Sequence, residues 1–186
     1  MRKPSDSRRL PSGVALGVAA MAVVVTASNI LVQYQINNWL TWGALSYPFA
    51  FLVTDLTNRR LGPAGARRVV WVGFAFAVAL SAWLATPRIA GASGTAFLVG
   101  QLADVWVFDR LRHLKWWQAP LVSSSLGSIL DTALFFSLAF AGTGEPWVTL
   151  GAGDLAVKAV FAALLLIPFR LLLEVIRPDG QAAAEA

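Results

Sequence analysis

The stretch VTLGAGDLAVKAVFAALLLIPF, residues Val148–Phe169, decides the fold class. It is apolar over the length that an α-helix, rising about 1.5 Å per residue, needs to cross about 30 Å of hydrocarbon. Yet Asp154 and Lys158 lie inside it. Charged side chains at bilayer depth are costly, so they usually face a bundle interior or a water-filled cavity and mark the path of a substrate or ion. The stretch therefore predicts a membrane-spanning helix of a carrier.

Similar apolar stretches recur along the whole chain. Apolar residues make up 57% of the 186 residues and charged residues 13%, against about 25% charge in soluble domains. The sequence predicts an all-α, polytopic membrane protein, a six-transmembrane-helix bundle over residues 13–176. A cytoplasmic tail, residues 1–12, precedes this bundle and a flexible tail, residues 177–186, follows it. The expected spans are Gly13–Val32, Trp39–Leu56, Val69–Ala85, Gly91–Phe108, Ala119–Ala141 and Val148–Phe169.

The distribution of basic residues predicts the orientation. Among the 15 lysines and arginines, Arg88 alone falls in a loop on one side and Lys158 falls within a span, whereas all the others lie in tails and loops on the opposite side. Positively charged loops remain in the cytoplasm, so we expect both termini to be cytoplasmic and the protein to be multi-pass in a bacterial inner membrane. No basic face is interleaved with aromatic residues, so the net charge of +5 does not indicate a nucleic-acid partner.

Three charged residues fall in one layer of the predicted bundle. Asp131 is 12 residues from Ala119 at the inner end of its span, or about 18 Å, and Lys158 and Asp154 are about 15 and 9 Å from the outer end of theirs. Asp154 and Lys158 are four residues apart, the spacing that lets an acidic and a basic side chain pair on a helix. An ion pair or triad near the midplane is able to hold a polar solute, which would displace the lysine.

Each of these residues also has a structural explanation. If Gly151–Gly153 were a loop, Asp154 would merely cap the last helix. Lys158 would then extend its side chain to the outer interface. Asp131 lies far from both ends of its span, so its alternative is a structural hydrogen bond to a neighbouring helix.

A second polar layer is expected near the cytoplasmic ends of two spans. Asp55 and Asp104 lie there, each followed by basic residues, so a surface ion pair is one explanation. Gln101, one turn before Asp104, favours a polar pocket instead. Pro48 removes a backbone donor and either leaves a carbonyl free for a cavity or simply kinks its helix. Further candidates for the cavity wall, which equally suit the membrane interface, are Asn29, Gln33 and Trp106.

Ordered motifs extend from Ala27 to Pro168. They are ASNILVQ from Ala27, TWGA from Thr41, YPF from Tyr47, TDLT from Thr54, GQLAD from Gly100, WW from Trp116, DT from Asp131, and Asp154 with Lys158. With these motifs the chain resembles the bacterial queuosine precursor transporters of the vitamin uptake transporter family. The resemblance implies an inner-membrane importer of 7-deazaguanine bases, cyano or aminomethyl substituted, which are salvaged to make the tRNA nucleoside queuosine.

The chemistry of such a base suits the candidate residues. A guanine-like edge presents N–H donors that a carboxylate accepts in pairs, and a flat base stacks on aromatic side chains. Asp131 is our first choice for the base edge, with Lys158 as its resting partner. Asp104 with Gln101 is the other choice, and Phe135 or Trp106 would supply the aromatic wall.

Two other kinds of protein are alternatives. A substrate-capture subunit of a multi-component vitamin importer has a similar six-helix plan and needs separate ATPase subunits, for which Gly13 and Gly17 offer a close-packing face. A membrane enzyme is disfavoured because the single histidine, His113, lies in a basic loop without a metal-ligand pattern or nucleophile motif. We therefore expect no catalytic residue, metal or cofactor. The expected partners are the nucleobase, the lipid bilayer and a second copy in a homodimer.

Overall fold

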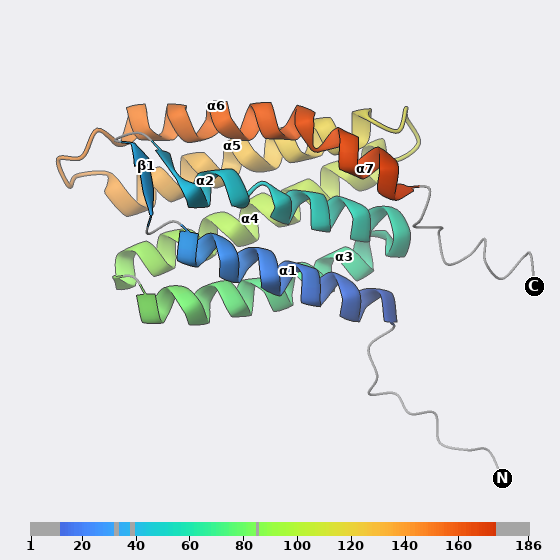
Figure 1. Cartoon of the computed structure of the whole chain (residues 1–186), viewed down its shortest axis with the longest axis horizontal. Helices are drawn as coiled ribbons and strands as arrows, with labels where there is room; N and C mark the ends of the chain where they lie inside the picture. Colours follow the sequence, from blue (N-terminus) through green and yellow to red (C-terminus); the bar gives the residue numbers. More distant parts are fainter. Residues whose placement is uncertain (1–11, 32–33, 38–39, 85, 174–186) are drawn as a thin grey trace, which may run out of the picture.

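The chain forms an elongated bundle of helices that lie side by side along one axis (Figure 1). The computed structural model describes residues 12–31, 34–37, 40–84 and 86–173, so the two predicted tails, apart from Ser12, lie outside the described residues. Its elements are α1 (Ser12–Leu31), β1 (Gln35–Asn37), β2 (Leu40–Thr41), α2 (Trp42–Ser46), α3 (Phe49–Leu84), α4 (Pro87–Leu111), α5 (Gln118–Phe140), α6 (Trp147–Leu164) and α7 (Leu166–Leu173). The prediction of a helical bundle is confirmed.

By length and composition, three segments of the described chain are able to cross a membrane. They are Trp42–Trp83, Gln118–Phe140 and Trp147–Leu173, and Gly13–Ser28 is a shorter apolar helix. A small antiparallel hairpin, with Gln35 opposite Thr41, joins α1 to α2. The all-α prediction missed this hairpin, because its strands are only three and two residues long and carry too little pattern to be seen in a sequence.

The long helix α3 reverses direction in its middle and contains the last part of one predicted span and nearly all of the next. Gly62 has φ 74° and ψ 179°, which are not helical angles. Both Thr57 and Val69 lie beside Gly17 of α1, although a straight helix would separate these two residues by about 18 Å. Pro63 then begins the second arm, at a position where a helix tolerates a missing N–H group. The two arms of α3 therefore lie antiparallel (Figure 1).

Substituting Gly62 with alanine is expected to lower the free energy of unfolding by about 1–3 kcal/mol, because this φ and ψ combination is essentially restricted to glycine. No atom lies within 4 Å of the position that a Cβ atom would take at Gly62, so crowding contributes nothing. Gly91→Ala, a helical site with equally open space, should be neutral or stabilise by up to about 1 kcal/mol. Thermal unfolding in detergent would measure both, and equal effects would contradict a conformational cause.

Prolines divide two of the predicted spans, Trp39–Leu56 and Val148–Phe169. Pro48 has no N–H group to continue the helix, and α2 ends at Ser46 while α3 begins at Phe49. Pro168 likewise has no N–H group to donate to the carbonyl of residue 164. Helix α6 ends at that residue, and Leu165 lies between α6 and α7. Pro48 was expected either to leave a carbonyl free for a cavity or to kink its helix, and the backbone shows the kink. This break brings Tyr47 and Pro48 to the interior of the bundle.

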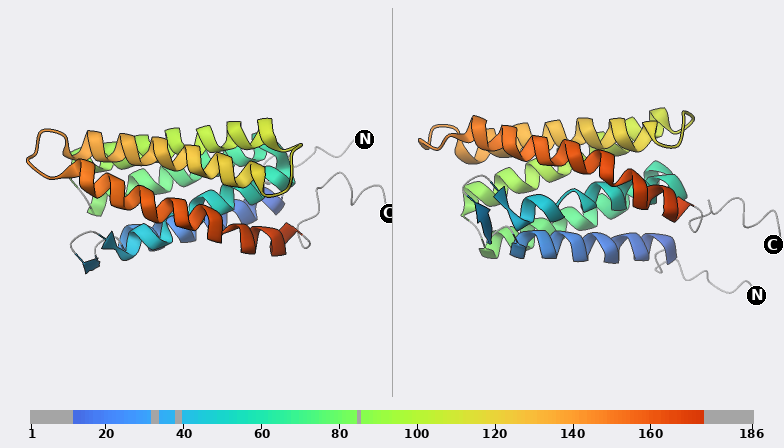
Figure 2. Two further views of the ribbon diagram at one scale, coloured as in Figure 1. Left: turned by 90° about the horizontal axis from the view of Figure 1, so that it is seen from above. Right: turned by 45° about the horizontal axis from the view of Figure 1, so that its top comes forward.

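Two packing contacts position the interior side chains. Residues of α1, both arms of α3 and α4 form the main apolar core around Met21, Val69 and Phe97. On the other side α5 packs between α4 and α6, and the right-hand view of Figure 2 shows α5 and α6 on the side of the bundle opposite α1. Where α4 meets α5, the backbones touch at Gly100 and Gly127, because a Cβ atom on either would lie 3.0 Å or less from the other's carbonyl oxygen.

Candidate functional site

The three charged residues of the predicted layer meet inside the bundle. Lys158 Nζ lies 2.6 Å from Asp131 Oδ2 and 2.6 Å from Asp154 Oδ2. The lysine and Asp131 are buried, with 5% and 4% of each residue exposed. The pairing of Asp154 with Lys158 on one helix and the wider triad, both expected from the spacing, are confirmed as contacts. We call Asp131, Asp154 and Lys158 the charged triad.

Two hydroxyl groups complete the charged triad. Tyr47 donates a hydrogen bond to Asp131 Oδ1 at 2.9 Å, and its ring centroid lies 5.2 Å from Lys158 Nζ. Lys158 Nζ donates to Thr132 Oγ1 at 3.0 Å, and Thr132 Oγ1 donates to Asp154 Oδ2 at 2.7 Å. The ammonium group thus has three oxygen partners and an aromatic face, which together compensate the loss of its hydration.

The structural alternative for Asp154 and Lys158 is wrong. Helix α6 begins at Trp147, so Gly151–Gly153 is helical and Asp154 lies well inside the helix rather than at its cap. Lys158 points into the bundle and not toward an interface. Asp131 does form hydrogen bonds to neighbouring helices, which is compatible with a structural role and with substrate binding alike.

The second polar layer is also fully interior. Asp55 and Asp104 are 2% and 0% exposed, so the surface-ion-pair explanation does not hold. Ser123 donates to Asp55 Oδ1 at 3.2 Å, and the Ser124 hydroxyl lies 3.0 Å from Asp55 Oδ2 and 3.5 Å from Asp104 Oδ1. The two carboxyl groups also contact each other. We call Asp55 and Asp104 the carboxyl pair.

Gln101 joins this layer through Thr54, whose hydroxyl lies 2.6 Å from Gln101 Oε1. Three buried polar atoms near this layer have no hydrogen-bond partner among the described residues: Gln101 Nε2, Asp104 Oδ2 and Asn58 Oδ1. Unsatisfied buried polar atoms are rare in folded proteins and usually indicate a water, an ion or a functional group. The hydrogen bonding of this layer is therefore incomplete among the described residues.

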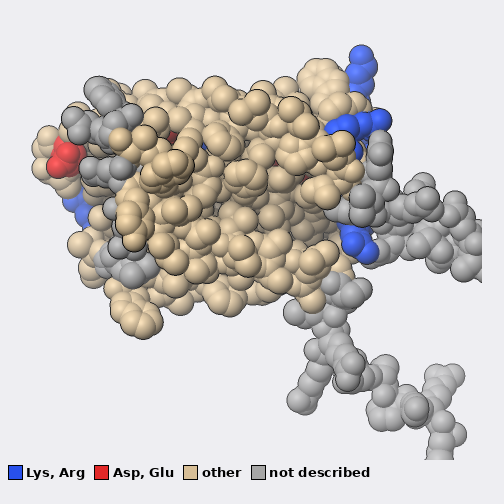
Figure 3. Space-filling view, viewed as in Figure 1, with Lys and Arg blue, Asp and Glu red and all other residues tan. Residues whose placement is uncertain are grey.

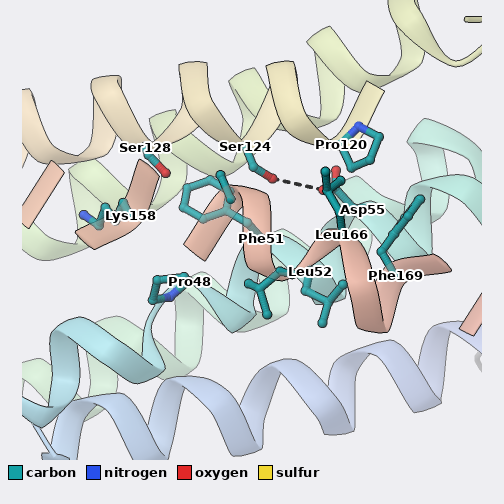
Figure 4. Close-up of a pocket in the computed structure, with 12 residues that line it drawn as sticks. Pro48, Phe51, Leu52, Asp55, Pro120, Ser124, Ser128, Lys158, Leu166 and Phe169 are labelled. Carbon is teal, nitrogen blue, oxygen red and sulfur yellow. Dashed lines mark hydrogen bonds between the residues drawn. The ribbon is translucent and has the colours of Figure 1, made fainter. Parts of the chain in front are cut away.

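A narrow pocket connects the charged triad with the carboxyl pair. Lys158 and Ser128 lie toward one end and Asp55 lies toward the other, where Ser124 donates to it (Figure 4). The free space is about 20 Å³, which is room for a water molecule and far less than a purine-sized base needs. The apolar walls come from α3, α5, α6 and α7: Pro48, Phe51, Leu52, Pro120, Ala162, Leu165, Leu166 and Phe169.

Two further predicted site residues, Phe135 and Trp106, are not brought to this pocket. Phe135 packs on Phe136 and Phe140 near the end of α5. Trp106 is 57% exposed on α4 and stacks against Arg110, so its position suits the membrane interface. Gln33 and the side chain of Asn29 lie outside the described residues. Phe51 and Phe169 are the aromatic residues that line the pocket.

Sequence reasoning did not assign a role to several polar residues of the site. Tyr47 and Thr132 stood out only as parts of motifs. The run Ser123-Ser124-Ser125, within a span, was an available signal, because hydroxyl groups inside a membrane helix need partners. Within the described part of the chain, no group of three or more His, Cys, Asp or Glu residues is able to hold a metal ion. Carboxylates, hydroxyls, amides and one ammonium are the polar groups that the described interior offers.

Comparison with known proteins assigns the family. A family model described as "Putative vitamin uptake transporter" matches residues 41–86 and 81–173. A "Probable queuosine precursor transporter" of Haemophilus influenzae is 39% identical, and the "Queuosine precursor transporter" of Escherichia coli is 35% identical; each alignment covers 78% of this chain and 79% of the relative. The chain belongs to the queuosine precursor transporter family. A "Probable queuosine precursor transporter" of Bacillus subtilis is 25% identical over 69% of both chains.

No solved structure gives a significant match to the chain. The geometry above therefore describes the interior of a queuosine precursor transporter from this chain alone. Both polar layers lie within the residues that the family model matches. The family is a transporter family, in agreement with the prediction that the chain is not an enzyme.

Proposed function

We infer that this chain imports queuosine precursors, the cyano- and aminomethyl-substituted 7-deazaguanine bases. The observation that carries this inference is the 39% and 35% identity to two queuosine precursor transporters over most of the chain. The interior agrees with it, because ionisable residues buried within membrane segments usually mark the path of a polar substrate or ion. The names of these relatives favour a transporter over a substrate-capture subunit.

The orientation in the membrane follows from the charge distribution. We assign six membrane crossings to the bundle: α1, α2 with the first arm of α3, its second arm, α4, α5, and α6 with α7. Lysine and arginine side chains gather at the end where both termini leave, and the broad middle shows almost no charge (Figure 3). The positive-inside rule then supports cytoplasmic termini and, in a bacterium, the inner membrane.

The charged triad is the proposed contact for the base edge. At rest, Lys158 occupies Asp131 Oδ2, and a ligand that presents two N–H donors to Asp131 would take its place. The lysine would then remain paired with Asp154, and the N–H donors of the base would stabilise the charge of Asp131 in place of the ammonium group. Since the pocket is too narrow for the base, binding requires α6 and α7 to move away from α3.

Complementation tests the function. A bacterial strain that can neither make queuosine precursors nor import them should regain tRNA queuosine when it expresses this chain and receives a precursor at nanomolar concentration. Asp131→Asn should lower uptake by about 100-fold or more, as expected when a buried charge-assisted contact of about 3 kcal/mol is lost. Asp109→Asn, at a partly exposed aspartate on α4, is the matched control and should transport normally.

The outcomes separate the possibilities. If the wild-type chain does not restore modification although it is present in the membrane, the assigned substrate is wrong. If Asp131→Asn transports normally, Asp131 is a structural residue and the base edge binds elsewhere. Uptake by the purified chain alone in liposomes would exclude the need for separate ATPase subunits, and the mass of the purified particle would test the predicted homodimer.

A further inference from the structure

The carboxyl pair differs from the charged triad in having no cation among its contacts with the described residues. The ammonium group of Lys158 contacts both carboxylates of the triad. The side-chain contacts of Asp55 and Asp104 are instead with Ser123, Ser124 and each other. Two ionised carboxylates in contact, both shielded from water, repel each other strongly. The pair is therefore stable only if a positive charge joins it.

Hydrogen-bond donors are also too few for the carboxyl pair. Its four oxygen atoms meet two hydroxyl donors, Ser123 and Ser124, and Asp104 Oδ2 has no partner within the described part of the chain. One proton on either carboxyl group would remove a negative charge and add the missing donor. The contact between the carboxyl groups would then be a hydrogen bond, as in other pairs of carboxylates that share one proton.

Four cations of the surrounding elements, Lys158, Arg59, Arg112 and Arg170, are engaged elsewhere. On α6, Lys158 is held by the charged triad. Arg59 of α3 donates to the carbonyl of Arg112, and Arg112 donates to the carbonyl of Asn58 and to Asp109. Arg170 of α7 lies over the ring of Trp116. The sequence of α1 contains no charged residue. Nothing in this set neutralises the carboxyl pair from within the bundle.

We propose that Asp55 and Asp104 form the binding site of the coupling ion, a proton that moves inward with each substrate molecule. The pocket supplies the connection, because Asp55 lines one end and Lys158 lines the other. A base that displaces Lys158 from Asp131 changes the charge seen from Asp55 across this pocket. Because the negative charge of Asp131 is then less compensated, proton binding at the carboxyl pair is favoured, and by reciprocity a bound proton favours substrate binding by the same factor. The inference rests on the proposed transport function and adds its energy source.

The test uses the purified chain in liposomes with radiolabelled aminomethyl-7-deazaguanine. A gradient of one pH unit, acidic outside, should drive about tenfold accumulation if one proton accompanies one substrate molecule. Asp104→Asn removes the proton site without touching a residue that lines the pocket. In this variant, accumulation under the pH gradient should fall to the level without a gradient, and whatever exchange of labelled for unlabelled base remains should no longer respond to external pH. Asp109→Asn should accumulate like the wild type.

Each outcome is decisive. Wild-type exchange without accumulation under the gradient, or accumulation by Asp104→Asn, overturns the proton site and leaves the transport function standing. Absence of exchange in the wild type overturns the transport function instead. Infrared spectroscopy then decides the proton site without any substrate: a protonated carboxyl band at neutral pH should shift in heavy water and disappear in Asp104→Asn and in Asp55→Asn. A wild-type protein without such a band has no shared proton.

Discussion

Replacing Lys158 with methionine is expected to abolish uptake and to lower the free energy of unfolding by about 3–5 kcal/mol, the usual cost of removing one partner from a buried ion pair. Methionine fills much of the same volume, so packing is nearly kept. What is lost is the only cation of the charged triad, which leaves Asp131 and Asp154 buried without compensation. Thermal unfolding in detergent and uptake in liposomes would measure the two effects.

A triple variant separates the effect of the lysine on stability from its effect on transport. Combining Lys158→Met with Asp131→Asn and Asp154→Asn removes all three charges, so most of the lost stability should return while uptake stays absent. Lys115→Met, at an exposed lysine outside the helices, should change neither quantity. If Lys158→Met alone were as stable as the wild type, the lysine would not be neutralising a buried pair.

Substituting Gly127 with alanine is expected to lower the free energy of unfolding by about 1–3 kcal/mol, because the added methyl group overpacks a closed interface. Its Cβ would lie 2.7 Å from Phe51 Cε1, 2.9 Å from the Gly100 carbonyl oxygen and 3.2 Å from Asp104 Cβ. The carbonyl belongs to the backbone of α4 and cannot rotate away. Helices α4 and α5 must therefore separate, which also moves Ser124 away from the carboxyl pair.

Gly153→Ala is the matched control for this substitution. Gly153 is a helical glycine with no atom within 4 Å of its Cβ position, so alanine should be neutral or stabilise α6 by up to about 1 kcal/mol. Thermal unfolding of the two variants should shift in opposite directions, or at least differ clearly. A Gly127→Ala protein that melts like the Gly153→Ala protein would show that α4 and α5 are not in close contact.

The parts of this molecule that depend on one helix at a time could be predicted from the sequence. Asp154 and Lys158 are four residues apart, and that spacing is enough to predict their contact. The depth of Asp131 could be counted from the ends of its span. Helix boundaries were less accurate around Gly62, because the basic segment between the two predicted spans stays helical on both sides of one non-helical glycine.

The parts that depend on how helices meet could not be predicted in detail. Nothing in the order of residues shows that Ser124 of α5 lies between Asp55 of α3 and Asp104 of α4. That arrangement results from the close approach of Gly100 and Gly127. Trp106 illustrates the same limit. It is close to Asp104 in sequence, but its side chain lies on the outside of α4, and the sequence alone did not show in which direction it points.

The narrowness of the pocket has an electrical consequence. A carrier whose polar interior stayed open to both compartments would let ions run down their gradients and would discharge the cell. The free space of about 20 Å³ that Asp55 and Lys158 line has room for about one water molecule. In the conformation described, this pocket therefore offers ions no wide aqueous path, and a carrier that rests in such a state limits leakage between substrate cycles.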